Sequence, residues 1–196
     1  MSFHADEHTP IERLRSREEL EAQLSHVTAS PKDEGEVKLL VRRPEPSRRE
    51  IVSEAEFDTQ VGLVGDGWSV RESRRTPDRR PHPEMQINIM NSRVIALLAD
   101  TPEQWAFAGD QLFVDLDLSK ENLPPGTRLR VGSAELEVTA IPHTGCAKFR
   151  RRFGAEAHDW INSEVGRTLH LRGINARVIE PGTVRVGDVL RKEESA

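Results

Sequence analysis

Short runs of alternating apolar and polar residues dominate the chain after position 36. Leu129 and Val131 alternate with arginines, and Leu136 and Val138 alternate with glutamates. A period of two is typical of strands with one buried face. Such runs predict strands at 36–41, 50–52, 85–90, 111–114, 128–131, 135–140, 169–171 and 176–179. Many short strands separated by glycine and proline turns favour a sandwich or a closed barrel, because closure removes exposed sheet edges.

The first 35 residues have a different pattern. Thr9-Pro10-Ile11-Glu12 and Ser16-Arg17-Glu18-Glu19 both match the capping box that opens a helix, which predicts helix within 10–26. Its apolar positions are sparse, so we expect it to pack against the main body or a second chain. Residues 29–34 are expected to form a linker, since Pro31 and Gly35 punctuate them.

Two further helices are expected as insertions between strands. Residues 92–99 follow a cap at Asn91 or Ser92, and residues 155–161 have a helical pattern. The predicted fold class is therefore mainly β with inserted helices (α+β). The chain divides into a helical leader and linker at 1–35, a β-barrel domain at 36–191 and a tail at 192–196.

Composition limits the classes of partner. The 196 residues suffice for one well-buried core, and the formal charge of −5 gives no overall attraction to nucleic acid or to an anionic membrane. No apolar run approaches the length of a membrane span, and the first residues lack the pattern of a signal peptide. We therefore expect neither nucleic-acid nor membrane binding, and a cytoplasmic location suits the single cysteine.

That cysteine, Cys146, is the best candidate for chemistry. It cannot form an internal disulfide, so it serves packing, metal ligation or nucleophilic reactivity. The cations that follow it would favour the thiolate, the form that binds metals and attacks electrophiles. Burial as a small apolar side chain is the alternative.

A series of motifs leads up to Cys146 and continues beyond it. The order is Gly62-Leu63-Val64-Gly65-Asp66, Gln86-Ile87-Asn88, Gly109-Asp110, Pro125-Gly126, the strand 135–139, Cys146 and then Gly187-Asp188. Each Gly-Asp pair alone is a common turn. The ordered set resembles the MOSC domain, the module named after the C-terminal region of molybdenum cofactor sulfurases, and the match spans about residues 36–191.

The resemblance implies a MOSC-type β-barrel that is closed or nearly closed, with the family's cysteine at Cys146. That cysteine would be the protein ligand of molybdenum, or would carry a persulfide. The implied function is a molybdenum-cofactor-binding protein, as a reductase of N-hydroxylated compounds acting on a small-molecule substrate; the alternative is a carrier of cofactor or persulfide sulfur. Either role needs a separate redox partner or sulfur donor protein, since the chain has no ferredoxin-like cysteine set. The sparse leader is compatible with a homodimer.

Several residues near Cys146 are candidates to hold the cofactor. Thr144 and Gly145 would form an anion-binding nest if Gly145 has a positive φ, and Asn88 belongs to the motif set. Phosphate would be received by the cations that follow Cys146, namely Lys148, Arg150, Arg151 and Arg152. A solvated helix start is the alternative for at least two of the four, because successive helical positions cannot all face one pocket.

His143 is the second catalytic candidate, as a donor to a phosphate or to the Cys146 sulfur, or as a proton donor at neutral pH. A hydrogen-bonded histidine at a strand end is the alternative. Residues 71–84 predict a loop with five arginines against Glu72 and Asp78 in its first ten positions. This loop is a candidate anion gate, or a solvated surface loop.

Overall fold

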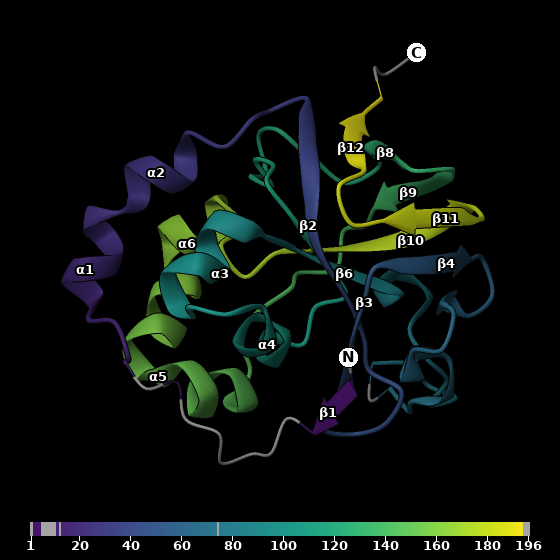
Figure 1. Cartoon of the computed structure of the whole chain (residues 1–196), viewed down its shortest axis with the longest axis horizontal. Helices are drawn as coiled ribbons and strands as arrows, with labels where there is room; N and C mark the ends of the chain where they lie inside the picture. The colour runs from purple at the N-terminus through teal and green to yellow at the C-terminus, as the bar shows by residue number, and fades with distance from the viewer. Residues whose placement is uncertain (1, 5–10, 12, 74, 194–196) are drawn as a thin grey trace.

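The computed structural model describes residues 2–4, 11, 13–73 and 75–193. Its main feature is a sheet whose ends join to make a closed barrel of seven strands (Figure 1). In order around the barrel these are β2 (Glu34–Arg42), β12 (Val189–Lys192), β8 (Arg128–Val131), β9 (Ala134–Val138), β10 (Ile174–Glu180), β6 (Ile87–Asn91) and β7 (Leu112–Val114). Pairing of β7 with β2 closes it. The barrel predicted from the alternating runs is confirmed.

Two smaller arrangements extend the barrel. β3 (Arg48–Val52) pairs with β2, and β1 (Ser2–His4) pairs with β3 at the edge of that sheet. A separate three-stranded sheet contains β11 (Gly182–Arg185), β4 (Glu54–Asp58) and β5 (Gly62–Leu63).

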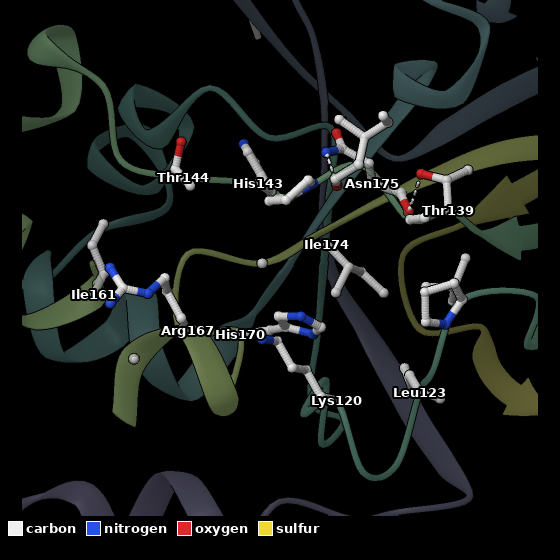
Figure 2. Close-up of a pocket in the computed structure, with 17 residues that line it drawn as sticks. Lys120, Leu123, Thr139, His143, Thr144, Ile161, Arg167, His170, Ile174 and Asn175 are labelled. Atoms are coloured by element: carbon white, nitrogen blue, oxygen red, sulfur yellow. Dashed lines mark hydrogen bonds between the residues drawn. The ribbon is translucent and has the colours of Figure 1, made fainter. Parts of the chain in front are cut away.

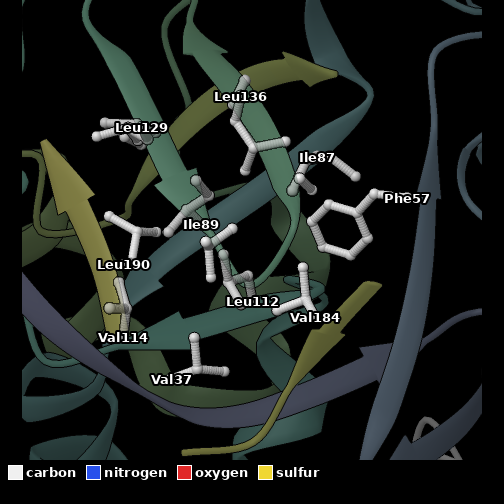
Figure 3. Close-up of a cluster of buried hydrophobic side chains, with 14 of the residues drawn as sticks. Val37, Phe57, Ile87, Ile89, Leu112, Val114, Leu129, Leu136, Val184 and Leu190 are labelled. Atoms are coloured by element: carbon white, nitrogen blue, oxygen red, sulfur yellow. The ribbon is translucent and has the colours of Figure 1, made fainter. Parts of the chain in front are cut away.

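The barrel separates two apolar cores. Figure 3 shows side chains such as Ile89, Leu112 and Leu129 converging inside the barrel. The second core lies outside, between the barrel and the helices. Strand β7 supplies both cores, because alternate side chains point to opposite faces. Leu112 and Val114 belong to the inner core, and Phe113 belongs to the outer one.

The helices gather on one side of the barrel (Figure 1). They are α1 (Arg17–Ala22), α2 (Leu24–Thr28), α3 (Ser92–Leu98), α4 (Pro102–Trp105), α5 (Ala147–Ile161) and α6 (Glu164–Thr168), with short 3-10 turns η1 (Gly67–Val70), η2 (Pro83–Met85) and η3 (Ala106–Ala108). Ser16 caps α1 in the predicted capping box, and Asn91 caps α3. The predicted cap at Thr9 lies outside the described residues. None of the described helices has the length and apolarity needed to cross a membrane.

Some predicted elements are wrong or incomplete. Residues 169–171 are not a strand: they follow α6 in a turn where His170 has a φ of 48°. Glu34, expected in the linker, is already the first residue of β2. The helix expected at 155–161 is the second half of α5, which begins at Ala147 and is kinked at Gly154, where φ is 88°. Strands β1, β4, β5, β11 and β12 were not predicted, since all but β4 are four residues or shorter and none has a long alternating run.

Candidate functional site

Four buried arginines converge on the short segment Ala106–Gly109. Each donates a hydrogen bond to a different backbone carbonyl of this segment, in the pairs Arg49 to Ala106, Arg152 to Phe107, Arg172 to Ala108 and Arg43 to Gly109. The carbonyls at the C-terminal end of a helical turn carry partial negative charge, which attracts cations. The segment ends at Gly109, whose φ of 89° favours glycine. We call these four residues the arginine cluster.

Arg43 ties the cluster to the Gly65-Asp66 motif and to Asn88. Its Nε lies 2.9 Å from Asp66 Oδ2, and its Nη2 lies 3.0 Å from Asp66 Oδ1, which is the paired geometry typical of an arginine and a carboxylate. Arg43 Nη1 donates to Asn88 Oδ1 at 2.9 Å. Asn88 Nδ2 in turn donates to Asn175 Oδ1 at 2.6 Å. The candidate Asn88 thus lies inside the site, where its side chain joins β6 to β10.

Arg172 forms the second buried ion pair of the cluster. Its Nη1 lies 2.7 and 2.9 Å from the two carboxylate oxygens of Asp110, and its guanidinium lies 5.1 Å from the centre of the Phe149 ring. Burial raises the pKa of Asp110, against the opposing effect of Arg172. The Gly109-Asp110 motif therefore supplies both a carbonyl and a carboxylate to the site.

Arg49 donates to the carbonyls of Ala106 and Arg48, and none of its hydrogen bonds within the described ranges is to a carboxylate. Burial, reinforced by the neighbouring charges of Arg152 and Arg43, lowers the pKa of Arg49 to about 9. The charge of Arg49 is therefore held at a cost in free energy. Two of the four guanidinium groups pair with buried carboxylates, Arg43 with Asp66 and Arg172 with Asp110.

His143 lies against the same group of charges. Its side chain is 12% exposed, and its Nδ1 is 3.5 Å from Asp110 Oδ1, too far for a good hydrogen bond. That nitrogen is buried without a hydrogen-bond partner in the described structure, and so is Arg172 Nε. Burial, with help from Arg172 and Arg43, lowers the pKa of His143 well below 6.5. The ring is neutral at pH 7, which argues against the predicted role as an acidic proton donor at neutral pH.

Cys146 is the residue that immediately precedes α5. Its side chain is exposed, so the alternative of a buried packing residue is wrong. Phe149, one turn further on, carries the ring that meets Arg172. The thiol is accordingly at the surface, at the end of a loop that connects His143 to the helix supporting the arginine cluster.

The cations that follow Cys146 point in different directions. Lys148, Arg150 and Arg151 are exposed, and Arg150 lies 3.4 Å from Asp159, a residue of the same helix. Arg152 is buried and reaches Phe107. Of the four predicted phosphate ligands, the structure brings only Arg152 into the cluster, as expected for successive positions on a helix.

The nest expected at Thr144 and Gly145 is not formed. Gly145 is not among the glycines with a positive φ, and its amide donates to Asn162 Oδ1 at 3.0 Å. A side chain at this position would meet Asn162 and Ile161 at 2.8 Å, so glycine serves close packing of the loop on α5. Thr144 is exposed and lines a cavity described below.

Two cavities flank the connection between Asn88 and Asn175. One, of about 290 Å³, is lined by Arg43, Asn88, Trp68 and the arginine-rich loop, which contributes Arg71 and Arg75. The loop predicted at 71–84 thus borders the arginine cluster through these two residues. Its Arg79 and Arg80 pair instead with Glu72 and Asp78 at the surface. The other cavity, of about 310 Å³, lies against His143, Thr144 and Asn175 (Figure 2).

Comparison with known families decides the identity of the barrel. The model of the MOSC domain matches residues 79–191, more than half of the chain. The chain belongs to the MOSC domain family. The match begins within the arginine-rich loop and includes Asn88, Asp110, Cys146 and Arg172.

Solved structures share the fold of this MOSC domain. The YuaD protein of Bacillus subtilis is 21% identical, aligns over 83% of this chain and 97% of its own, and has a TM-score of 0.57. A hypothetical protein is 20% identical over 84% of this chain and 69% of its own, with a TM-score of 0.55. YiiM from Escherichia coli is 20% identical over 82% of this chain and 71% of its own, with a TM-score of 0.50. No curated protein matches the chain.

Sequence reasoning missed most of the arginine cluster of the MOSC domain. Arg43 follows Arg42 after the run 39–41, Arg172 follows Leu171, and Arg49 lies on a strand between Arg48 and Glu50. An arginine beside a buried run is a weak signal, because the side chain is long enough to reach solvent. Asp66 and Asp110 belong to the motif set that indicates the family, but the motifs do not predict their pairing with Arg43 and Arg172.

Proposed function

We propose that this MOSC domain binds the molybdenum cofactor, with Cys146 as the protein ligand of the metal and the arginine cluster holding an anionic part of the cofactor. The observation that carries the proposal is the set of four buried arginines on the carbonyls of Ala106–Gly109. One of them, Arg49, hydrogen-bonds to carbonyls and to no carboxylate within the described residues. Arginine recognises phosphate strongly because its planar fork matches the phosphate oxygens.

The residues present fit such a ligand. The unpartnered Nδ1 of His143 and Nε of Arg172 are buried polar atoms, and leaving them unsatisfied costs free energy. An anion accepting hydrogen bonds near Asp110 would satisfy such donors and offset the crowding that lowers the pKa of Arg49. Arg71 and Arg75, at the edge of the neighbouring cavity, are placed to cover a ligand that enters from solvent.

The exposed thiol of Cys146 fits a soft metal ligand. No group of three or more His, Cys, Asp or Glu side chains gathers into a metal site within the described ranges. A metal at Cys146 would take its other ligands from elsewhere, and the cofactor supplies a sulfur-ligated, redox-active metal. Cys146 would fix the position of that metal, and the loop from His143 to Gly145 would hold Cys146 in place through the Gly145 to Asn162 hydrogen bond.

The activity that we propose on this basis is reduction of N-hydroxylated small molecules, with electrons from a separate redox partner. A neutral His143 can orient a bound group by hydrogen bonding. The chemical step would use a proton from another source, because His143 is already deprotonated at pH 7.

The test of cofactor binding is the pterin content of the purified full-length chain. The chain is produced in a host that makes the cofactor, and the oxidised pterin is released and measured by fluorescence. Arg49→Gln and Arg152→Gln should retain about tenfold less pterin than the wild type, because each removes a cation from the site. Lys32→Gln, an exposed control, should retain as much as the wild type. Absence of pterin from the wild type, or equal retention by all four proteins, would contradict the proposal.

The second candidate is a carrier of persulfide sulfur, which the exposure of Cys146 favours. A surface thiol is open to transfer of sulfur from a donor protein. Exposure to a cysteine desulfurase should then add the mass of one sulfur to the wild type, removable by reductant, and none to Cys146→Ala. An unmodified wild-type thiol would count against this role.

A further inference from the structure

The cavity of about 310 Å³ lies at one end of β9 and β10, next to α5 and α6. Figure 2 shows Thr144, His143 and Asn175 along one side of it, and Arg167, His170 and Lys120 along the other. None of the four arginines of the cluster lines this cavity, which is separate from the cavity at Arg43 and Asn88. His143 contacts both regions, because it is one of the residues that line this cavity and its Nδ1 lies 3.5 Å from Asp110 Oδ1.

The walls of the cavity are mostly apolar. Side chains from five segments of the chain supply them, including Leu123, Pro125, Val138, Ile141, Ile161 and Ile174. A cavity of this size and lining is typical of a site for a small molecule with an apolar body.

The charged residues at the cavity are all cations. They are Lys120 and Arg167, which come from two different segments of the chain. The backbone N–H of Lys120 donates to the carbonyl of Thr168, and this hydrogen bond joins the two segments. Neither side chain forms an ion pair with a residue in the described part of the chain, and no carboxylate is among the residues that line the cavity. Both residues are exposed, so each would attract an anionic group with the modest energy of an exposed ion pair.

His170 lines the same side of the cavity, and a hydrogen bond to the backbone holds its ring in place. Its Nδ1 lies 2.7 Å from the carbonyl of Leu118, and a carbonyl only accepts, so Nδ1 carries the proton. Its backbone is in the left-handed region, with a φ of 48°, a conformation that costs free energy for a residue other than glycine. Residues held in this way occur preferentially at ligand sites.

The cavity also lies close to the reactive thiol. Thr144 lines it, and Cys146 is two residues further on, so their Cα atoms are at most about 7 Å apart. Ile161, another wall residue, is the side chain against which Gly145 packs.

The geometry points to a binding site for a small molecule that has an apolar body and one carboxylate, with the carboxylate at Lys120 and Arg167 and the apolar part between Val138 and Ile174. The site places its ligand beside the loop of Cys146. It does not require the cofactor, so it stands or falls separately from the proposed function.

The test is a binding titration on the full-length Cys146→Ser chain from a host that makes no cofactor, followed by backbone NMR shifts. The probes are hexanoate and benzoate, with hexanamide and benzamide as neutral isosteres and acetate as an anion without an apolar body. We expect the two acids to bind with dissociation constants on the order of 1 mM or tighter, and the amides and acetate to bind at least about fivefold more weakly. The shifts should map to Val138, Thr139, Ile174 and Asn175.

Three variants distinguish this cavity from other sites. Lys120→Gln and Arg167→Gln should each weaken binding of the acids about two- to fivefold, the range of one exposed ion pair. Lys32→Gln removes an exposed lysine elsewhere and should leave it unchanged. Ala140→Phe should abolish binding without unfolding the protein, because Ala140 lines the cavity but is exposed.

The assignment is overturned if acids and amides bind equally, or if no acid binds below about 10 mM. Shifts that map to Ala106–Gly109 instead would also overturn it, because the acids would then occupy the arginine cluster.

Discussion

At the scale of single residues, the arginines of the cluster differ in whether they pair with a buried carboxylate. Arg43 and Arg172 each pair with a buried carboxylate, whereas Arg49 is crowded by the charges of Arg152 and Arg43. Removing one partner of a buried pair leaves an uncompensated charge and is strongly destabilising. Replacing Arg49 removes its repulsion with the neighbouring arginines and loses its hydrogen bonds to backbone carbonyls. We therefore expect Arg49 to contribute less to the stability of the fold than Arg43 and Arg172 do.

Urea unfolding at low ionic strength tests this difference. We expect Arg172→Gln to lower the free energy of unfolding by about 3–5 kcal/mol, because Asp110 is left unpaired. Arg49→Gln should change it by less than about 1 kcal/mol. Inorganic phosphate should stabilise the wild type more than chloride of equal ionic strength, and this difference should disappear in Arg49→Gln. Equal costs for the two substitutions would contradict the distinction.

The pH dependence of stability depends on His143 in a direction set by burial. Its pKa in the folded chain is below the unfolded value of 6.5, so the unfolded state binds more protons as the pH falls below 6.5. The contribution of His143 to the free energy of unfolding is therefore fully present above pH 6.5 and decreases as the pH falls below that value. Between pH 7 and pH 5 the wild type should lose more unfolding free energy than His143→Asn, by up to about 2 kcal/mol, the limit that the unfolded pKa sets.

Denaturant titrations at a series of pH values measure that difference. The other histidines, including His170, whose pKa burial also lowers, are present in both proteins and cancel. Parallel stability curves for the wild type and His143→Asn would show that His143 is not held neutral.

At the scale of elements, the turn η3 and the glycine that ends it organise the cluster. The carbonyls of Ala106–Gly109 face four arginines that come from β3, α5 and the segments after β2 and before β10. Such long-range convergence is invisible in the sequence, because the partners are backbone atoms that any residue supplies. The alternation at 128–138, by contrast, predicted β8 and β9 closely, since their period follows directly from burial of one face.

Gly109 and Gly126 offer a matched pair for testing the role of this turn. Both have a φ near 90°, and an added side chain would meet only Arg49, at 3.8 Å, in the first case and nothing within 4 Å in the second. Alanine should therefore cost about 1–3 kcal/mol of stability at either position. Only Gly109→Ala should also weaken phosphate binding, measured by calorimetry, because it shifts the carbonyls that hold the arginines. Equal phosphate affinity in the two variants would show that the turn does not organise the cluster.

At the scale of the whole molecule, the barrel wall joins two cores into one folding unit. Sequence patterns predicted the barrel and the α1 cap, because each depends on local periodicity or on a capping motif, and the order of the motifs indicated the MOSC family. They did not give Arg43, Arg49 or Arg172, which act through tertiary contacts, or the absence of a nest at Gly145, which depends on packing against α5. The predicted domain boundaries at 1–35 and 192–196 stay predictions.

Substitutions on β7 test the unity of the fold. Leu112→Ala opens space in the inner core and Phe113→Ala in the outer one, and each should lower the free energy of unfolding by about 2–5 kcal/mol. Both variants should unfold in a single transition seen equally by circular dichroism and tryptophan fluorescence, because one strand supplies both cores. Two separate transitions in either variant would show that the cores unfold independently.

The most direct measurement of the central claim is the molybdenum content per chain, determined by mass spectrometry on protein from a host that makes the cofactor. The wild type should contain molybdenum approaching about one atom per chain, and Cys146→Ser should contain much less, because a hydroxyl is a poorer ligand than a thiolate for a soft, sulfur-ligated metal. Equal molybdenum in the two proteins, or none in the wild type, would contradict the assignment of Cys146 as the metal ligand.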